Sequence, residues 1–92
     1  MNDEAKNTKY IEIPIGVVKD NSISSTAKVL IGLIITLSMK DGYCYASNKY
    51  LGNILNVSIR TITSCLSSLK NRGFIYTKDI YNKRRIYVAK SI

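Results

Sequence analysis

The apolar residues of this chain change their spacing at Gly73, and this change limits the folds that the chain can adopt. Before Gly73, apolar side chains recur every three or four positions, as in amphipathic helices. After it, residues 74–80 and 84–88 are rich in β-branched and aromatic residues and flank the short connection 81–83. Helices followed by one hairpin predict a single α+β domain in which the hairpin packs on a helical core.

Three helices are predicted before Gly73, and each follows a serine that can cap its first turn. The tight connection Asn56-Val57 separates the last two helices, and Gly73 ends the last one as a left-handed terminal residue. Asp41-Gly42 predicts a turn, and Tyr43-Cys44-Tyr45 a very short strand. The predicted helices are residues 25–39 after Ser24 or Ser25, residues 48–55 after Ser47 with Leu51, Ile54 and Leu55 buried, and residues 59–72 after Ser58.

The first of these helices is apolar over most of its circumference, and only Lys28, Gly32 and Thr36 mark a hydrophilic strip. Such a helix needs cover on two sides. Two arrangements can provide the second cover. Either residues 11–18 pack on this helix, or another protomer does. The alternation of residues 10–15 predicts a short edge strand followed by a turn or a helical start. Residues 1–9 are expected to be a flexible arm before a domain of residues 10–92.

The residue types present leave little for catalysis or metal binding. The chain has no histidine, and Cys44 and Cys65 form no C-x-x-C pair. We therefore expect no enzymatic activity, no catalytic residue, no metal and no cofactor, with both thiols buried in a reducing cytoplasm. No apolar run approaches the length of a membrane span, and no secretory leader is recognisable. A cytoplasmic protein without a membrane partner is expected.

The excess positive charge lies entirely in the second half of the chain. Residues 1–42 carry five basic and five acidic side chains, whereas residues 43–92 carry nine basic groups against Asp79 alone. The second half therefore accounts for the whole net charge of +8. Such asymmetry fits a partner with dense negative charge, and nucleic acid is the most common soluble partner of that kind.

A helical projection of residues 59–72 separates an apolar arc from a polar face that has no acidic residue. Short hydroxyl side chains let a helix approach base edges closely, and Arg60 can donate two hydrogen bonds to guanine. Ser58, at the positive end of the helix, suits a phosphate. The apolar arc consists of Ile62, Cys65, Leu66 and Leu69. The polar face and its flanks consist of Arg60, Thr61, Thr63, Ser64, Ser67, Ser68 and Asn71.

The hairpin carries the densest basic cluster, in which Lys83-Arg84-Arg85 joins Lys78 and Tyr81. The third helix offers one long basic side chain on its polar face and the hairpin offers several, so we expect Arg84 or Arg85 to enter a DNA groove. Contacts with phosphates there release counterions and make affinity depend steeply on salt. The alternative is a solvated hairpin whose charges protect an edge strand from aggregation.

These patterns resemble those of a known family. Residues 46–51 (ASNKYL), 56–62 (NVSIRTI) and 69–75 (LKNRGFI) are similar to the winged helix-turn-helix pattern of bacterial regulators. Ile13-Pro14, residues 25–28 (STAK) and 42–47 (GYCYAS) resemble the N-terminal domain of replication initiators from plasmids and phages of low-GC Gram-positive bacteria. The resemblance covers roughly residues 10–90. It implies a three-helix core with a C-terminal two-stranded β-hairpin wing.

The resemblance also implies that the third helix and the wing contact double-stranded DNA, often as a homodimer on repeated sites. The expected function is sequence-specific DNA binding at a replication or conjugative transfer origin of a plasmid or other mobile element, with replication or relaxosome proteins as possible further partners. Initiators usually continue into further domains, so the chain is either a fragment of one or a free-standing protein. The candidate DNA-binding residues are Asn48, Lys49, Ser58, Arg60, Thr61, Ser64, Ser67, Ser68, Lys78, Tyr81, Asn82, Lys83, Arg84 and Arg85.

Three other functions are compatible with the sequence. A transcriptional regulator of the mobile element would use the same DNA-binding residues. A protein-interaction module would use the wide apolar circumference of the first helix. Single-stranded nucleic acid binding is supported by seven tyrosines and the basic half. However, the tyrosines are scattered along the chain, and we expect Tyr43, Tyr45 and Tyr87 to be packing residues rather than platforms for bases.

Overall fold

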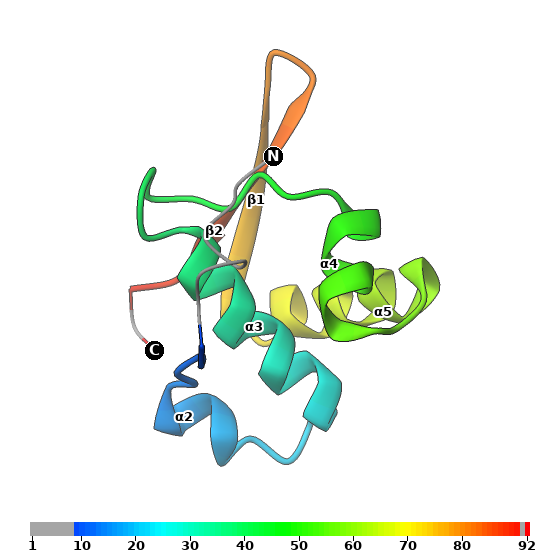
Figure 1. Cartoon of the computed structure of the whole chain (residues 1–92). Coiled ribbons are helices and arrows are strands. Elements are labelled where there is room, and N and C mark those ends of the chain that lie inside the picture. Colours follow the sequence, from blue (N-terminus) through cyan, green and yellow to red (C-terminus); the bar gives the residue numbers. More distant parts are fainter. Residues whose placement is uncertain (1–8, 91) are drawn as a thin grey trace.

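The computed structural model describes residues 9–90 and 92 and shows a helical core with a protruding hairpin (Figure 1). The hairpin runs behind α3, and its tip extends beyond the helices, while α4 and α5 lie together at one side. This arrangement confirms the predicted α+β, winged helix-turn-helix class. The elements are α2 (Ile15–Val18), α3 (Ser25–Leu37), α4 (Asn48–Leu55), α5 (Ile59–Asn71), β1 (Ile75–Ile80) and β2 (Lys83–Val88).

The three longer helices begin at the predicted serines. Ser24, Ser47 and Ser58 each accept a hydrogen bond of 3.1 Å from the backbone N–H three residues later. Each bond satisfies one of the N–H groups that a helix leaves without an internal partner. The helix ends agree as well, because Asn56 after α4 and Gly73 after α5 have the left-handed φ values of 59° and 75°.

The core is built around α3, which packs against α5 and β2 on one side. Leu30, Ile31, Ile34 and Leu37 of this helix are fully buried. Residues 11–18 cover the other side, so the first of the two arrangements left open by the sequence is the one observed.

The N-terminal segment docks on the strip of α3 that the sequence analysis described as hydrophilic. Gly32 is buried there, and a Cβ added to it would lie 2.9 Å from Cδ1 of Ile11 and 3.1 Å from Cγ1 of Ile13. One turn earlier, Lys28 donates a hydrogen bond of 2.6 Å to the carbonyl oxygen of Val18. The strip is therefore a docking groove for residues 11–18.

Two local expectations are wrong. Residues 10–14 form no strand, although the helical start expected after them is present as α2. Ile54 was expected at the buried edge of α4 but is 44% exposed. Leu51 and Gly52 are the buried residues of α4, since Gly52 is the point of closest approach to the following turn. The expected arm of residues 1–9 lies outside the described residues, apart from the exposed Lys9.

The hairpin pairs β1 with β2 in antiparallel register, from Ile75 opposite Val88 to Ile80 opposite Lys83. Its turn has two residues rather than the three expected, and both have positive φ, as the twist of a tight hairpin requires. The short strand expected around Cys44 is reduced to one bridge, between Cys44 and Ile86. Cys44 and Cys65 are both buried, as predicted, and form no disulfide with each other.

The close approach of α4 to the following turn leads to a first prediction. A Cβ at Gly52 would lie 2.7 Å from the carbonyl oxygen of Val57. We expect Gly52→Ala to lower the free energy of unfolding by about 1–3 kcal/mol, although alanine favours helices, because backbone must move to make room. The matched control is Gly16→Ala in α2, where no atom lies within 4 Å. Urea denaturation in which both variants are as stable as the parent would contradict this account.

Asp20 fastens the loop between α2 and α3 to the end of α5. Its Oδ1 accepts hydrogen bonds from the backbone N–H and the hydroxyl of Ser22, and its Oδ2 accepts one of 2.8 Å from Nε of Arg72. The carboxylate side chain is only 7% exposed. The bonds from Ser22, followed by that from Arg72, lower the pKa of Asp20 from 3.8 to about 2.

This lowered pKa predicts a pH dependence of stability. A carboxyl group whose pKa is lower in the folded state contributes stability above its unfolded pKa and loses it as the pH falls through its folded pKa. Asp20→Asn should therefore lower the thermal midpoint at neutral pH, and its difference from the parent should shrink between about pH 4 and pH 2. Thermal denaturation of both proteins over this range checks the effect. A difference that is independent of pH would show that the charge of Asp20 is not responsible.

Candidate nucleic-acid interface

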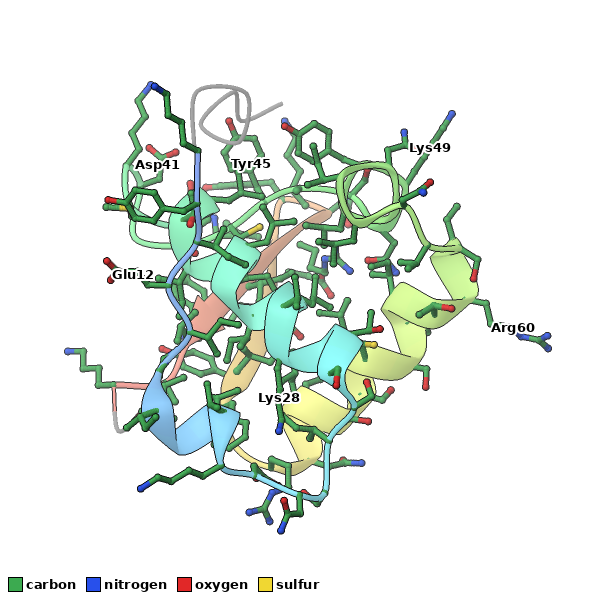
Figure 2. The ribbon with its side chains drawn as sticks, turned by 60° about the horizontal axis from the view of Figure 1, so that its bottom comes forward. Glu12, Lys28, Asp41, Tyr45, Lys49 and Arg60 are labelled. Atoms are coloured by element: carbon green, nitrogen blue, oxygen red, sulfur yellow. The ribbon has the colours of Figure 1, made fainter. Side chains whose placement is uncertain are left out.

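The face of α5 predicted to contact DNA is exposed, and the opposite arc is buried. Ile62, Cys65, Leu66 and Leu69 are the buried residues of this helix, as the projection predicted. Arg60, Ser64 and Ser67 are exposed, and Figure 2 shows the Arg60 side chain extending outward from α5. Because α5 contains no acidic residue, its exposed face presents only positive or neutral groups to a partner.

Several hydroxyl groups near α5 already take part in hydrogen bonds. Ser58 caps the helix and lies 3.0 Å from the hydroxyl of Thr61, while Ser68 donates to the carbonyl oxygen of Ser64. Among the described residues, no hydrogen bond engages the side-chain hydroxyls of Ser64 and Ser67. These two hydroxyls and Arg60 are therefore the groups of α5 most available to base edges.

Arg84 connects the wing to the helices. Its Nη1 donates to Oδ1 of Asn48, and its Nη2 donates to the carbonyl oxygen of Ala46, both at 2.6 Å. Asn48 in turn donates from Nδ2 to the hydroxyl of Thr63 at 3.3 Å. One chain of hydrogen bonds thus joins β2, the start of α4 and the exposed side of α5. Burial of the guanidinium lowers the pKa of Arg84 from its usual value.

This connection was missed in the sequence, where Arg84 was grouped with the basic residues that contact DNA. Strand alternation could have revealed it. Arg84 lies two positions from the buried Ile86 and therefore faces the same side of the hairpin as Ile86. Asn48 was likewise treated only as a DNA contact. The entry of a hairpin arginine into a DNA groove stays a prediction. The guanidinium of Arg85 stacks over the ring of Tyr43 at 4.3 Å. Arg84, by contrast, is the arginine that bonds to Asn48 and Ala46.

The remaining candidate residues outside α5 are exposed on the wing and on α4. Lys78, Asn82 and Lys83 are exposed on the wing, and Tyr81 at its tip is 94% exposed. Lys49 extends outward from α4 (Figure 2). A groove runs between the wing tip and the start of α4, lined by Tyr45, Ala46, Ser47, Asn48, Lys83 and Arg84. Of the predicted residues, the structure brings Arg84 and Asn48 together in one hydrogen-bonded junction that reaches Thr63 of α5.

Residues 9–90 and 92 offer no cluster of three or more side chains suited to hold a metal ion. In the same part of the chain, no helix has the length and apolar character needed to cross a bilayer.

The helical core, the exposed face of α5 and the two-stranded wing define a winged helix-turn-helix domain. A family model for the helix-turn-helix domain matches residues 21–75, and the chain therefore belongs to that family. The N-terminal domain of a DNA-binding protein has the same fold, with 24% sequence identity and a TM-score of 0.67 over the whole of this chain and 82% of that chain. A Rep–DNA complex is similar at 23% identity and a TM-score of 0.65, over the whole of this chain and 83% of the other. No curated protein sequence matches.

The junction around Arg84 leads to a prediction about stability. Arg84→Ala leaves the carbonyl oxygen of Ala46 and Oδ1 of Asn48 without their donors. We expect the free energy of unfolding to fall by about 2 kcal/mol, because these are charge-assisted and partly buried bonds. The matched control is Lys83→Ala, which removes the exposed neighbouring charge and should change stability by less than about 0.5 kcal/mol. Equal urea midpoints for both variants would show that the hydrogen bonds of Arg84 do not stabilise the fold.

Proposed function

We propose that this chain is a sequence-specific double-stranded DNA-binding protein that reads DNA with α5 and its basic wing. The observation that carries the proposal is the exposed, acid-free face of α5, which stands beside the wing and is joined to it through Arg84, Asn48 and Thr63. An α-helix fits the major groove, which is about 12 Å wide, and a hairpin beside the helix reaches the neighbouring backbone or minor groove. The confinement of the net positive charge to residues 43–92 supports the same partner.

Within this interface the residues have different roles. Arg60 reads a guanine through two hydrogen bonds, and the small side chains of Ser64 and Ser67 allow α5 to approach the bases. Lys83 and Arg85 contact phosphates or a groove from the wing. Arg84 and Asn48 act as positioning residues that fix the angle between wing and helix. The other contacts proposed are Lys49, Ser58, Thr61, Ser68, Lys78, Tyr81 and Asn82.

We further propose that the DNA site lies at an origin of replication of a plasmid or other mobile element and that the protein binds repeated sites as a homodimer. The resemblance of the sequence to replication initiators and the shared fold with a Rep–DNA complex support replication over the transfer origin or a promoter. Footprinting over an element that carries the gene distinguishes these sites. A protein-docking role for α3 stays the alternative, because residues 11–18 cover the strip around Gly32, whereas Val29 remains 38% exposed beside Leu55 and Val57.

The reading roles can be separated by two substitutions. Arg60→Ala should weaken binding to the preferred duplex by about 1–3 kcal/mol and relax base preference at one position. Lys83→Ala should weaken preferred and random duplexes equally and reduce the slope of log K against log salt by about one. The measurement is fluorescence anisotropy at several salt concentrations, on a duplex selected from a random library.

The matched control is Lys19→Ala, which removes one exposed positive charge at the end of α2, away from the wing. Its affinity for DNA and its salt slope should differ from those of the parent only by the small effect of one lost charge. If Arg60→Ala and Lys83→Ala behave like this control, α5 and the wing do not form the DNA interface.

A further inference from the structure

The side of the hairpin that faces away from the helices carries mainly aromatic and basic residues, with Ile80 as its aliphatic residue next to the turn. Ile75 and Ile86 are buried on the inner side of the sheet, where the hairpin packs on α3 and α5. Strand alternation turns the intervening residues outward, and the bridge between Cys44 and Ile86 adds Tyr43 and Tyr45 along the edge of β2. We call the resulting surface the outer sheet face, which consists of Tyr43, Tyr45, Tyr76, Lys78, Arg85 and Tyr87.

The four tyrosines of the outer sheet face form a continuous row. Tyr76 and Tyr87 are stacked with ring centroids 5.1 Å apart and planes 10° apart. Tyr43 follows Tyr87 at 5.7 Å, and Tyr45 follows Tyr43 at 6.3 Å. These tyrosines are scattered along the chain, and the fold brings them together. Tyr43 and Tyr87 are half-buried within the row, but Tyr76 and Tyr45 remain 49% and 41% exposed.

Two cations stand over this row. The ammonium of Lys78 lies 5.6 Å from the ring centroid of Tyr87 and 5.9 Å from that of Tyr76. The guanidinium of Arg85 lies 4.3 Å from the ring of Tyr43. Asp79, the one acidic residue of the hairpin, lies on the inner side opposite Arg84. The two strands thus present planar rings and positive charge without a carboxylate.

We propose that the outer sheet face binds single-stranded DNA, with bases stacking on Tyr45 and Tyr76 and with Lys78 and Arg85 contacting the phosphates. Exposed aromatic rings beside cations bind single strands without sequence preference, because every base has a face that can stack. In a duplex the base faces are already stacked, so exposed rings would gain nothing there. An acidic peptide would satisfy the two cations but would leave the row of rings without a matching group.

This surface lies on the side of the sheet opposite the helices and is separate from the exposed face of α5. A single strand on it would share Lys78 and Arg85 with the proposed duplex interface but would also use the rings of Tyr45 and Tyr76, to which that interface assigns no role. The choice of DNA over RNA rests on the proposed function, since a duplex reader holds its sheet close to DNA. The stacking itself is independent of that proposal.

The test uses the whole chain and a fluorescently labelled oligothymidylate of about 15 nucleotides, a length that spans a typical single-strand site. Tyr45→Ala and Tyr76→Ala should each weaken binding about tenfold, because each removes one stacking ring. Tyr76→Phe should bind like the parent, since the ring remains. Intrinsic tyrosine fluorescence should be quenched by the unlabelled oligonucleotide in the parent.

The control variant is Arg60→Ala, which should leave oligothymidylate binding unchanged while weakening the preferred duplex. Tyr76→Ala, outside the groove beside α4, should show the reverse behaviour, so the failure of one proposal is distinguishable from that of the other. Tyr45 lies outside the two strands, so its variant keeps the test valid if Tyr76→Ala unfolds the hairpin.

Three results would overturn the proposal. Oligothymidylate binding that is equal in the parent and in both alanine variants would show that the rings are not used. Tighter binding of the corresponding oligouridylate by tenfold or more would assign the face to RNA. Loss of self-association or of a protein partner in the tyrosine variants, with oligothymidylate binding intact, would assign the face to protein.

Discussion

The fold depends on covering α3 on both sides. Most of this helix is apolar, and its fully buried residues Leu30, Ile31 and Ile34 require neighbours around most of its circumference. The hairpin and α5 provide one layer, and residues 11–18 provide the other over Gly32. Because only one arc of α5 is buried in this core, the rest of its surface is exposed and available to a partner. The exposed polar face of α5 thus follows from the way α3 is buried.

The sequence predicted the helices and hairpin because their signals are local. Ser24, Ser47 and Ser58 cap helices at the expected positions, and the period of the apolar residues identifies the buried arc of α5. The cover of α3 was left open, because its apolar pattern shows that cover is needed but not which segment supplies it. Ile54 was misplaced for a similar reason, since only the tertiary contact at Gly52 determines how α4 approaches its neighbour.

The candidate site was less predictable than the fold, because charge alone does not show where a side chain points. Arg84 and Arg85 are equivalent in a count of basic residues, yet strand alternation directs them to opposite sides of β2. Arg84 bonds to Asn48 and Ala46, while Arg85 stacks on Tyr43. Strand alternation could have placed Tyr76 and Tyr87 on one side of the hairpin, but no sequence signal extends the row to Tyr43 and Tyr45, which a single bridge at Cys44 brings alongside β2.

The hairpin therefore separates two surfaces within six residues of β2. Its inner side, through Arg84, holds the wing at a fixed place relative to α4 and α5, and its outer side carries the rings and the cations. A tight turn with positive φ at Tyr81 and Asn82 keeps the register that sets this alternation. A shift of one residue would send Arg84 outward and Arg85 toward Asn48, and would place Ile86 in water. The same register thus maintains the core, the junction with α5 and the tyrosine row.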